Sequence, residues 1–299
     1  MQAIDLEDIK TYRPRIQSDD IRHIKDSFSH LIRKMHQTPE QVVGYPTGVW
    51  QGFNRSFGGA RGELVTITAE TGQGKSTFAR NWLVDTINQN RTALLISLEE
   101  SMSQVTECFS KMIARKDVTD FTDEDAHAVA EQYDRWPLYY LDHQGPIPER
   151  DCLRLIDYAV EEKGVKFILI DHLDYLEKMW GSRNESYVIG DTMRRLAGKA
   201  HVHDVTIVLI VHPAKLQQKG VGSREIGLDE LKGSSSIKQE SDAVFGLYRP
   251  DPAVAESYLR FLKIRNHRFG HNVSGRIKFG FDPKTLELWE LTGELEYGG

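Results

Sequence analysis

One segment has the residue types and the spacing of a phosphate-binding loop. Residues 64–79 read LVTITAETGQGKSTFA, which is an apolar run, a loop ending in Gly74-Lys75-Ser76, and a helical pattern. In this order the backbone N–H groups of the loop and the N-terminus of the helix form a concave anion site. Lys75 adds a positive charge, and Ser76 adds a hydroxyl ligand for Mg²⁺. The predicted phosphate-binding residues are Ala69, Glu70, Thr71, Gly72, Gln73, Gly74, Lys75, Ser76 and Thr77, with Ala69 in place of the usual first glycine.

A magnesium ion at such a loop needs a second carboxylate, which a parallel strand supplies at its carboxyl end. Residues 166–171 read KFILID, an apolar run that ends in Asp171. A strand that ends in aspartate is common in α/β proteins, so this signal is weak alone, but its position in the chain after the loop supports it. We predict that Ser76 and Asp171 hold the metal.

Two further carboxylates, Glu99 and Glu100, follow the apolar run at 94–98. Because the carboxyl ends of parallel strands converge on one crevice, one of these side chains can reach the water that attacks a γ-phosphate. Glu100 fits a helix N-terminus, where the helix dipole favours an acid. Glu99 is therefore the predicted catalytic base, and Glu100 is the alternative.

His212 follows the apolar run at 205–211, which we expect to lie beside the strand that ends in Asp171. That position would bring the imidazole near the γ-phosphate. A lone histidine at the end of a strand is as often structural, so the sequence supports both interpretations equally.

These side chains need a sheet whose strands run parallel and end together. After Gly62, short apolar runs alternate with helical stretches, which predicts a parallel sheet covered by helices and hence an α/β fold. Residues 258–264 and 276–281 alternate in polarity and predict an antiparallel hairpin at the edge of the sheet. The predicted core strands cover 64–68, 92–97, 138–141, 167–171, 206–211 and 243–247, several of them apolar on both faces, as buried strands are.

The N-terminal part is predicted to lie outside this domain. Residues 1–17 are polar without a period and are expected to form a flexible arm, while 19–36 carry apolar side chains at helical spacing. Residues 37–60 are rich in Gly, Pro and Thr and are expected to be a linker. The helix could pack on its own domain or on a neighbouring subunit. We predict an arm, helix and linker over 1–45, the main domain over 46–290 and a tail over 291–299.

The composition of the 299-residue chain narrows the class of protein. Hydrophobic residues make up 39% and charged residues 27%, which excludes a disordered or fibrous chain. No run reaches the ~18 uncharged apolar residues of a membrane-spanning helix. The N-terminus has no signal-peptide pattern, which predicts an intracellular protein. Cys108 and Cys152 stand alone and no paired histidines lie near them, so neither a disulfide framework nor a zinc site is expected. With 38 basic and 44 acidic residues, the net charge is −6, so any nucleic-acid contact must come from a local patch.

The loop and the three strand ends together resemble the RecA-like core of the hexameric replicative helicases. This family includes the bacterial replicative helicase, phage primase-helicases and the mitochondrial helicase Twinkle, and its loop often lacks the first glycine. LEES at 98–101 resembles the strand with the catalytic glutamate, and VHPAK at 211–215 resembles the γ-phosphate sensor strand in its histidine form. The resemblance covers about residues 18–290. It implies a RecA-like P-loop NTPase with an N-terminal linker helix that uses ATP, or another NTP or dNTP, with Mg²⁺.

Two further segments carry the resemblance. GSSSIKQESD at 233–242 resembles the element that lines the central channel and links nucleotide to DNA, which implies a nucleotide contact for Gln239. RFLKIRNHRFG at 260–270 resembles the strand with the arginine finger, an arginine that completes the site of the neighbouring subunit. Arg268 is the better match through its Arg-Phe-Gly. Lys263-Ile-Arg265 has the family's lysine–arginine spacing, so Arg265 is the alternative.

The segment 213–224, PAKLQQKGVGSR, is the candidate DNA-binding loop. It holds Lys215, Lys219 and Arg224, two glycines and no acid, which suits a loop that follows DNA phosphates. A solvated loop would look much the same, and the wider region is close to neutral. Lys232 and Lys238 are the next candidates for DNA contacts.

The resemblance predicts a hexameric ring that translocates on single-stranded DNA, unwinds forked duplex during replication and works with the primase and polymerase of a replisome. It implies the cytoplasm of a bacterial or phage-infected cell, or the mitochondrial matrix. Two alternatives are a RecA- or repair-type DNA-dependent ATPase and a nucleotide-gated scaffold or loader without unwinding. The 260–270 segment and the N-terminal helix favour the ring. Because no primase, zinc-binding or collar domain precedes that helix, we expect a minimal or shortened helicase.

Overall fold

The computed structural model describes residues 1–4, 45–177, 185–213, 225–231, 234–251, 253–264, 275–291 and 296–297. The predicted helix at 19–36 lies outside these residues. Within them, no helix is long and apolar enough to cross a membrane.

The described chain is built on one large sheet whose middle strands are parallel. The strand order is β1-β4-β3-β5-β6-β2-β7-β8-β9-β10, and every pair from β1 to β7 is parallel. Each position of β2, β3, β5, β6 and β7 is buried, which explains why the sequence of these strands is apolar on both faces. The parallel strands are β2 (Leu64–Thr68), β3 (Ala93–Ser97), β4 (Leu138–Leu141), β5 (Phe167–Asp171), β6 (Thr206–Val211) and β7 (Ala243–Tyr248), which confirms the predicted α/β sheet.

The C-terminal edge of the sheet is antiparallel, also as predicted. Strands β8 (Glu256–Ile264) and β9 (Gly275–Phe281) pair with each other, and β8 pairs with β7. The sequence did not indicate β10 (Leu288–Glu290) or β11 (Glu296–Tyr297), which both pair with β9. Both are short, and a run of two or three residues shows no period from which a strand can be predicted.

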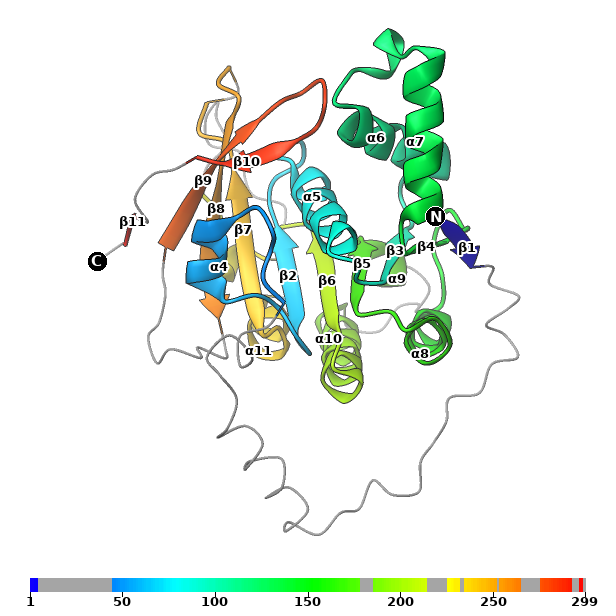
Figure 1. Cartoon of the computed structure of the whole chain (residues 1–299). Helices are drawn as coiled ribbons and strands as arrows, with labels where there is room; N and C mark the ends of the chain where they lie inside the picture. Colours follow the sequence, from blue (N-terminus) through cyan, green and yellow to red (C-terminus); the bar gives the residue numbers. More distant parts are fainter. Residues whose placement is uncertain are drawn as a thin grey trace, which may run out of the picture.

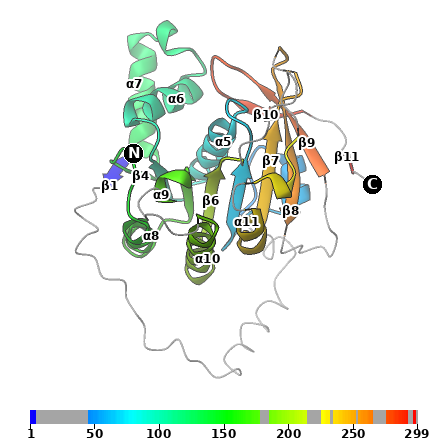
Figure 2. The ribbon, with the colours of Figure 1, turned by 180° about the vertical axis from the view of Figure 1, so that it is seen from behind.

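Helices cover both faces of the sheet (Figures 1 and 2). One core cluster packs α8 (Glu149–Lys163), α10 (Glu185–His203) and α11 (Ser234–Glu240) on one face. The other cluster packs α4 (Gln51–Phe57), α5 (Lys75–Asn88) and α6 (Met102–Ala114) on the opposite face. The remaining helices are α7 (Asp123–Arg135), the short α9 (Asp174–Glu177), and the 3-10 turns η1 (Val118–Asp120) and η2 (Leu228–Glu230).

The N-terminal residues correct one expectation. Residues 2–4 form β1 (Gln2–Ile4), which pairs in parallel with the edge strand β4, so this part of the predicted flexible arm is ordered. An edge strand leaves a row of backbone N–H and C=O groups without partners, and a short added strand satisfies some of them. The pairing joins segments more than a hundred residues apart in the sequence, where local composition carries no information.

The predicted linker at 37–60 is also partly wrong, because α4 lies inside it. Its apolar side chains enter the core, where the ring of Trp50 stacks on Phe78 at 5.0 Å between centroids. The carboxylate of Glu290 on β10 accepts hydrogen bonds from the backbone N–H groups of Gly52 and Phe53 at 2.7–3.2 Å. A distant residue therefore caps this helix, while its Gly- and Thr-rich surroundings concealed it in the sequence.

Phe53 is fully buried among the rings of Trp50, Phe78, Trp82 and Phe245. We expect Phe53→Ala to lower the free energy of unfolding by about 3–5 kcal/mol, because it removes apolar burial and leaves a cavity. The measurement is a urea titration followed by circular dichroism.

The matched control is Val49→Ala, since Val49 is 64% exposed beside the same helix and should change stability by less than ~0.5 kcal/mol. Equal unfolding midpoints for Phe53→Ala and the parent would contradict the packing of α4 into the core.

Candidate active site

The phosphate-binding loop connects β2 to α5 with two glycines in left-handed conformations. Gly72 has φ +78° and Gly74 has φ +89°, and a Cβ at either position would meet no atom within 4 Å. Backbone conformation, rather than space, therefore demands glycine here. Gly74 is the N-cap of α5 and provides no side-chain cap. The first N–H groups of α5 thus face the loop without a capping side chain, which suits an anion.

Lys75 lies across this loop. Its Nζ donates hydrogen bonds to the carbonyl oxygens of Ala69 at 2.9 Å and Glu70 at 3.1 Å. Burial lowers the pKa of Lys75, and the nearby carboxylates of Asp171 and Glu99 oppose that shift. The ammonium is thus held beside the loop, within a short movement of any phosphate that binds there.

A pocket of about 270 Å³ lies at the carboxyl ends of the parallel strands. It brings together Glu99 after β3, Asp171 at the end of β5 and His212 after β6, which are far apart in the sequence. Of the predicted phosphate-binding residues, Thr71, Gly72, Gly74, Lys75, Ser76 and Thr77 line this pocket. Ala69 and Glu70 contact Lys75 instead, and the amide oxygen of Gln73 accepts a hydrogen bond from the backbone N–H of Arg249 at 2.9 Å.

The two predicted metal ligands, Ser76 and Asp171, both line the pocket. A hydroxyl and a buried carboxylate are hard oxygen donors, which Mg²⁺ prefers together with water and phosphate oxygens. The donor set therefore fits a magnesium ion that is brought in by a nucleotide.

The structure separates the two adjacent glutamates. Glu100 forms an ion pair with Arg80 of α5, whose side chain is 5% exposed and also lies 3.7 Å from Asp171. Burial opposes the charge of Arg80, but Glu100 and Asp171 outweigh it and raise the pKa of Arg80. Glu99 instead lines the pocket, where its Oε2 lies 3.0 Å from Nε2 of His172. This arrangement leaves Glu99 available for chemistry and engages Glu100 in structure.

His212 lies in the same pocket, and its ring is 4.4 Å from that of His172 at an interplanar angle of 87°. Burial lowers the pKa of His212, and the positive charges of Lys75 and His172 lower it further. The imidazole is therefore neutral at physiological pH and offers one donor and one acceptor nitrogen.

Sequence analysis missed Arg80 and His172. His172 directly follows Asp171, so its place at a strand end was visible in the sequence. Arg80 had a weaker signal, as a charged residue among the apolar positions of α5.

The remaining predicted site residues are not in this pocket. Arg265, Arg268, Lys215, Lys219, Arg224 and Lys232 lie outside the described residues. Gln239 and Lys238 are exposed on α11, which ends just before β7 begins. They therefore lie at the amino ends of the strands, away from the loop of their own subunit (Figure 1). Nζ of Lys263 donates a hydrogen bond to the carbonyl of Ser241 at 2.6 Å.

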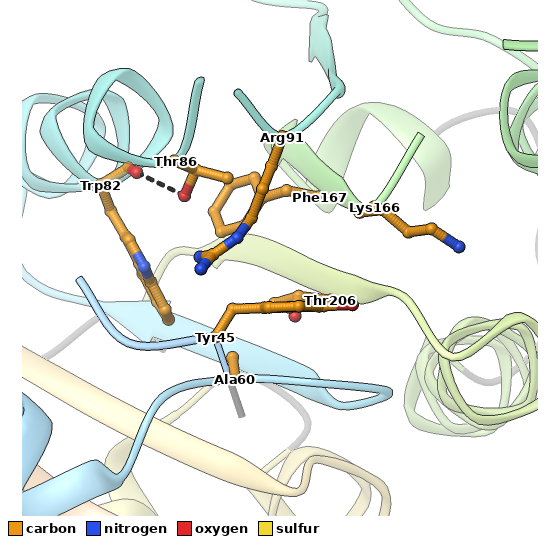
Figure 3. A pocket seen from close by; sticks show the side chains of 8 residues that line it. All are labelled: Tyr45, Ala60, Trp82, Thr86, Arg91, Lys166, Phe167 and Thr206. Atoms are coloured by element: carbon orange, nitrogen blue, oxygen red, sulfur yellow. Dashed lines mark hydrogen bonds between the residues drawn. The ribbon is translucent and has the colours of Figure 1, made fainter. Parts of the chain in front are cut away.

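A second, much smaller cavity lies at the amino ends of the strands (Figure 3). Its volume is about 10 Å³, which holds about one water molecule and excludes a nucleotide. The guanidinium of Arg91 lies 4.4 Å from the ring centre of Tyr45, and the backbone N–H of Tyr45 donates to Ala60. These contacts anchor the start of the main domain rather than form a site.

Comparison with known proteins points in one direction. Residues 44–288 match the family described as the DnaB-like helicase C terminal domain. Replicative DNA helicase DnaB of Helicobacter pylori is 23% identical over 289 residues, which cover 86% of this chain and 58% of that protein. The DNA helicase/primase of Enterobacteria phage T3 is 28% identical over 277 residues, which cover 87% of this chain and 48% of that protein. The chain thus spans about half the length of these curated relatives.

Solved structures share the fold. One of them, an isolated ATPase domain, superposes with a TM-score of 0.76 at 18% identity, covering 91% of this chain and 100% of that domain. A DnaB-like replicative helicase, studied with its interactions with primase, superposes with a TM-score of 0.72 at 18% identity. That match covers 91% of this chain and 68% of the helicase, so the RecA-like fold is confirmed.

Proposed function

Because the chain belongs to the family of DnaB-like helicase C-terminal domains, we propose that it is the motor of a replicative DNA helicase. In this proposal it hydrolyses ATP, or another NTP or dNTP, with Mg²⁺ at subunit interfaces. The energy drives movement along single-stranded DNA and separation of the duplex. Residues 46–290 form the motor, 1–45 the arm, helix and linker, and 291–299 the tail.

The observation that carries the proposal is the convergence of five side chains on one pocket, which are Lys75, Ser76, Glu99, Asp171 and His212. Lys75 and the N-terminus of α5 neutralise phosphate charge, while Ser76 and Asp171 hold the magnesium and its water shell. Glu99 accepts a proton from the attacking water, and neutral His212 donates a hydrogen bond to the γ-phosphate. Each role matches the chemistry of the group that the pocket presents.

A contact between subunits is part of the proposal. The γ-phosphate end of the pocket opens at the surface of the sheet, where an arginine from a neighbour can stabilise transition-state charge. We assign this role to Arg268, with Arg265 as the alternative. Gln239 lies at the opposite end of the strands from its own loop, so any nucleotide that it contacts belongs to another subunit. Head-to-tail contacts of this kind close into a ring, for which we propose a hexamer.

The partners in the proposal are single-stranded and forked DNA, with primase and polymerase as further components of a replisome. The place of action is the cytoplasm of a bacterial or phage-infected cell, or the mitochondrial matrix for an organellar homologue. The similar solved helicase was described with its interactions with primase, which supports primase as a partner.

The test compares ATP turnover with and without single-stranded DNA and then measures unwinding of a forked duplex. A helicase motor shows stimulated turnover and unwinding. A RecA-type ATPase would show stimulation without unwinding, and a nucleotide-gated scaffold would show neither. Lys75→Ala is the control for contaminating ATPases, since it removes the charge that the loop provides for the phosphates.

We expect the triple substitution of Lys215, Lys219 and Arg224 by Ala to weaken single-strand binding and to flatten its salt dependence. Each phosphate contact contributes roughly 0.7 to the log–log slope for single strands, so the loss should approach ~2. Basal ATPase should survive, while DNA stimulation and unwinding should fail together. Fluorescence anisotropy over a salt series measures the slope.

The control is a triple substitution of the exposed Lys116, Arg135 and Lys284, which removes the same charge from other surfaces. An unchanged slope in the 215–224 variant would assign the DNA contacts to Lys232 and Lys238 instead.

A further inference from the structure

We infer that Glu99, His172 and His212 form a binding site for a transition-metal dication such as Zn²⁺, distinct from the magnesium site at Ser76 and Asp171. One ligand atom from each of the three residues can be chosen so that all three lie within 4.8 Å of one another. The residues follow β3, β5 and β6, which are neighbours in the sheet. Rigid strand ends therefore place the three donors together before any metal binds.

The donor set selects the metal. Two imidazole nitrogens and one carboxylate oxygen are the ligands of many three-residue zinc sites, with Zn–N and Zn–O bonds of about 2.0–2.2 Å. Donor atoms around a tetrahedral zinc are then roughly 3.3 Å apart, and Nε2 of His172 and Oε2 of Glu99 are already 3.0 Å apart. Mg²⁺ prefers an octahedron of oxygens and binds imidazole poorly, so it does not compete here.

The surroundings of His172 resemble the support that metal-bound histidines have. Its side chain is 6% exposed, and its ring packs edge-on against Tyr175 at 5.0 Å. Oδ2 of Asp174 lies 3.9 Å from Nδ1, on the far side of the ring from Glu99. When Nε2 binds a metal, the ring proton moves to Nδ1 and faces the Asp174 carboxylate. A carboxylate in this position orients the ring and makes it a better ligand.

The fourth coordination position faces the pocket of about 270 Å³, where water or a phosphate oxygen fits. The positive charge of Lys75 opposes a nearby cation, but its Nζ is held by the carbonyls of Ala69 and Glu70. The carboxylates of Glu99, Asp171 and Asp174 surround the three donors and favour a cation. The sequence did not predict this site because its ligands are far apart along the chain.

The consequence for turnover rests on the proposed function. Glu99 is the proposed base and His212 the proposed γ-phosphate contact, so a zinc ion that binds both removes them from catalysis. Zinc should therefore inhibit hydrolysis of Mg-ATP, and a chelator should restore it.

Binding is tested directly, without nucleotide. Zn²⁺ is titrated into the full chain by calorimetry, and Co²⁺ is titrated while the visible absorption of a four-coordinate cobalt site is followed. We expect one site per chain in the parent. Glu99→Gln and His212→Asn should each weaken the affinity at least ~10-fold, since each removes one ligand, and Asp174→Asn should weaken it ~10-fold through the ring of His172. His127→Ala is the matched control, because His127 is exposed on α7.

The inference is overturned if the parent shows no such site, or if Glu99→Gln and His212→Asn bind both metals as tightly as the parent. Both ligands are partly or fully accessible at the pocket, and thermal melting of each variant shows whether it is folded. A parent that binds zinc through these residues but shows no ATPase would contradict the proposed function and leave the metal site intact. A parent with DNA-stimulated ATPase and no zinc site would do the reverse.

Discussion

Glu99→Gln is expected to bind nucleotide as tightly as the parent and to lose ATP turnover by roughly 10²–10⁴-fold. Positioned proton transfer contributes this much to catalysis, and a carboxamide of the same shape accepts no proton. Binding depends on Lys75, Ser76 and the loop, none of which the substitution touches. Steady-state turnover and the affinity for a fluorescent nucleotide, measured on the same preparation, give the two numbers.

The matched control is Glu100→Gln, which changes the neighbouring residue by the same atoms. Glu100 pairs with Arg80, so this variant should lose stability while it keeps far more turnover than Glu99→Gln. If Glu99→Gln hydrolyses ATP at the parent rate and Glu100→Gln does not, the catalytic base is Glu100 and the ion pair with Arg80 must open during the reaction.

The second large effect is expected from Arg268. Its replacement by Ala should leave nucleotide binding largely intact and should lower turnover by the assembled ring by roughly 10³–10⁵-fold, the range for an arginine finger. The reason is that the proposed guanidinium serves the site of the neighbouring subunit, where it meets charge that develops only in the transition state.

Mixed assemblies test the direction of this contact. Arg268→Ala subunits keep an intact loop but offer no finger, whereas Lys75→Ala subunits offer a finger but have no working loop. Mixing the two should restore part of the turnover that neither has alone. Arg265→Ala is tested in the same way, and recovery that depends on Arg265 rather than Arg268 would move the finger to Arg265.

Features that depend on local order along the chain were predictable. The strands β2, β4, β5 and β6 begin and end where their apolar runs do, because a buried strand needs uninterrupted apolar residues and ends where polarity returns. The loop between β2 and α5 was equally clear, since left-handed glycines at Gly72 and Gly74 are required by the turn itself. The antiparallel edge followed from alternating polarity, which a half-buried strand shows.

Features that depend on contacts between distant segments were not predictable. The sequence alone determined the α/β class, the phosphate-binding loop, and the acids and histidine that follow the core strands. Only the tertiary structure decided which of two adjacent glutamates enters the pocket, because Arg80 on another element pairs with Glu100. It also placed His172 against Glu99 and α4 beneath Glu290, since hydrogen bonds and ion pairs form between atoms that are close in space, however far apart they are in the chain.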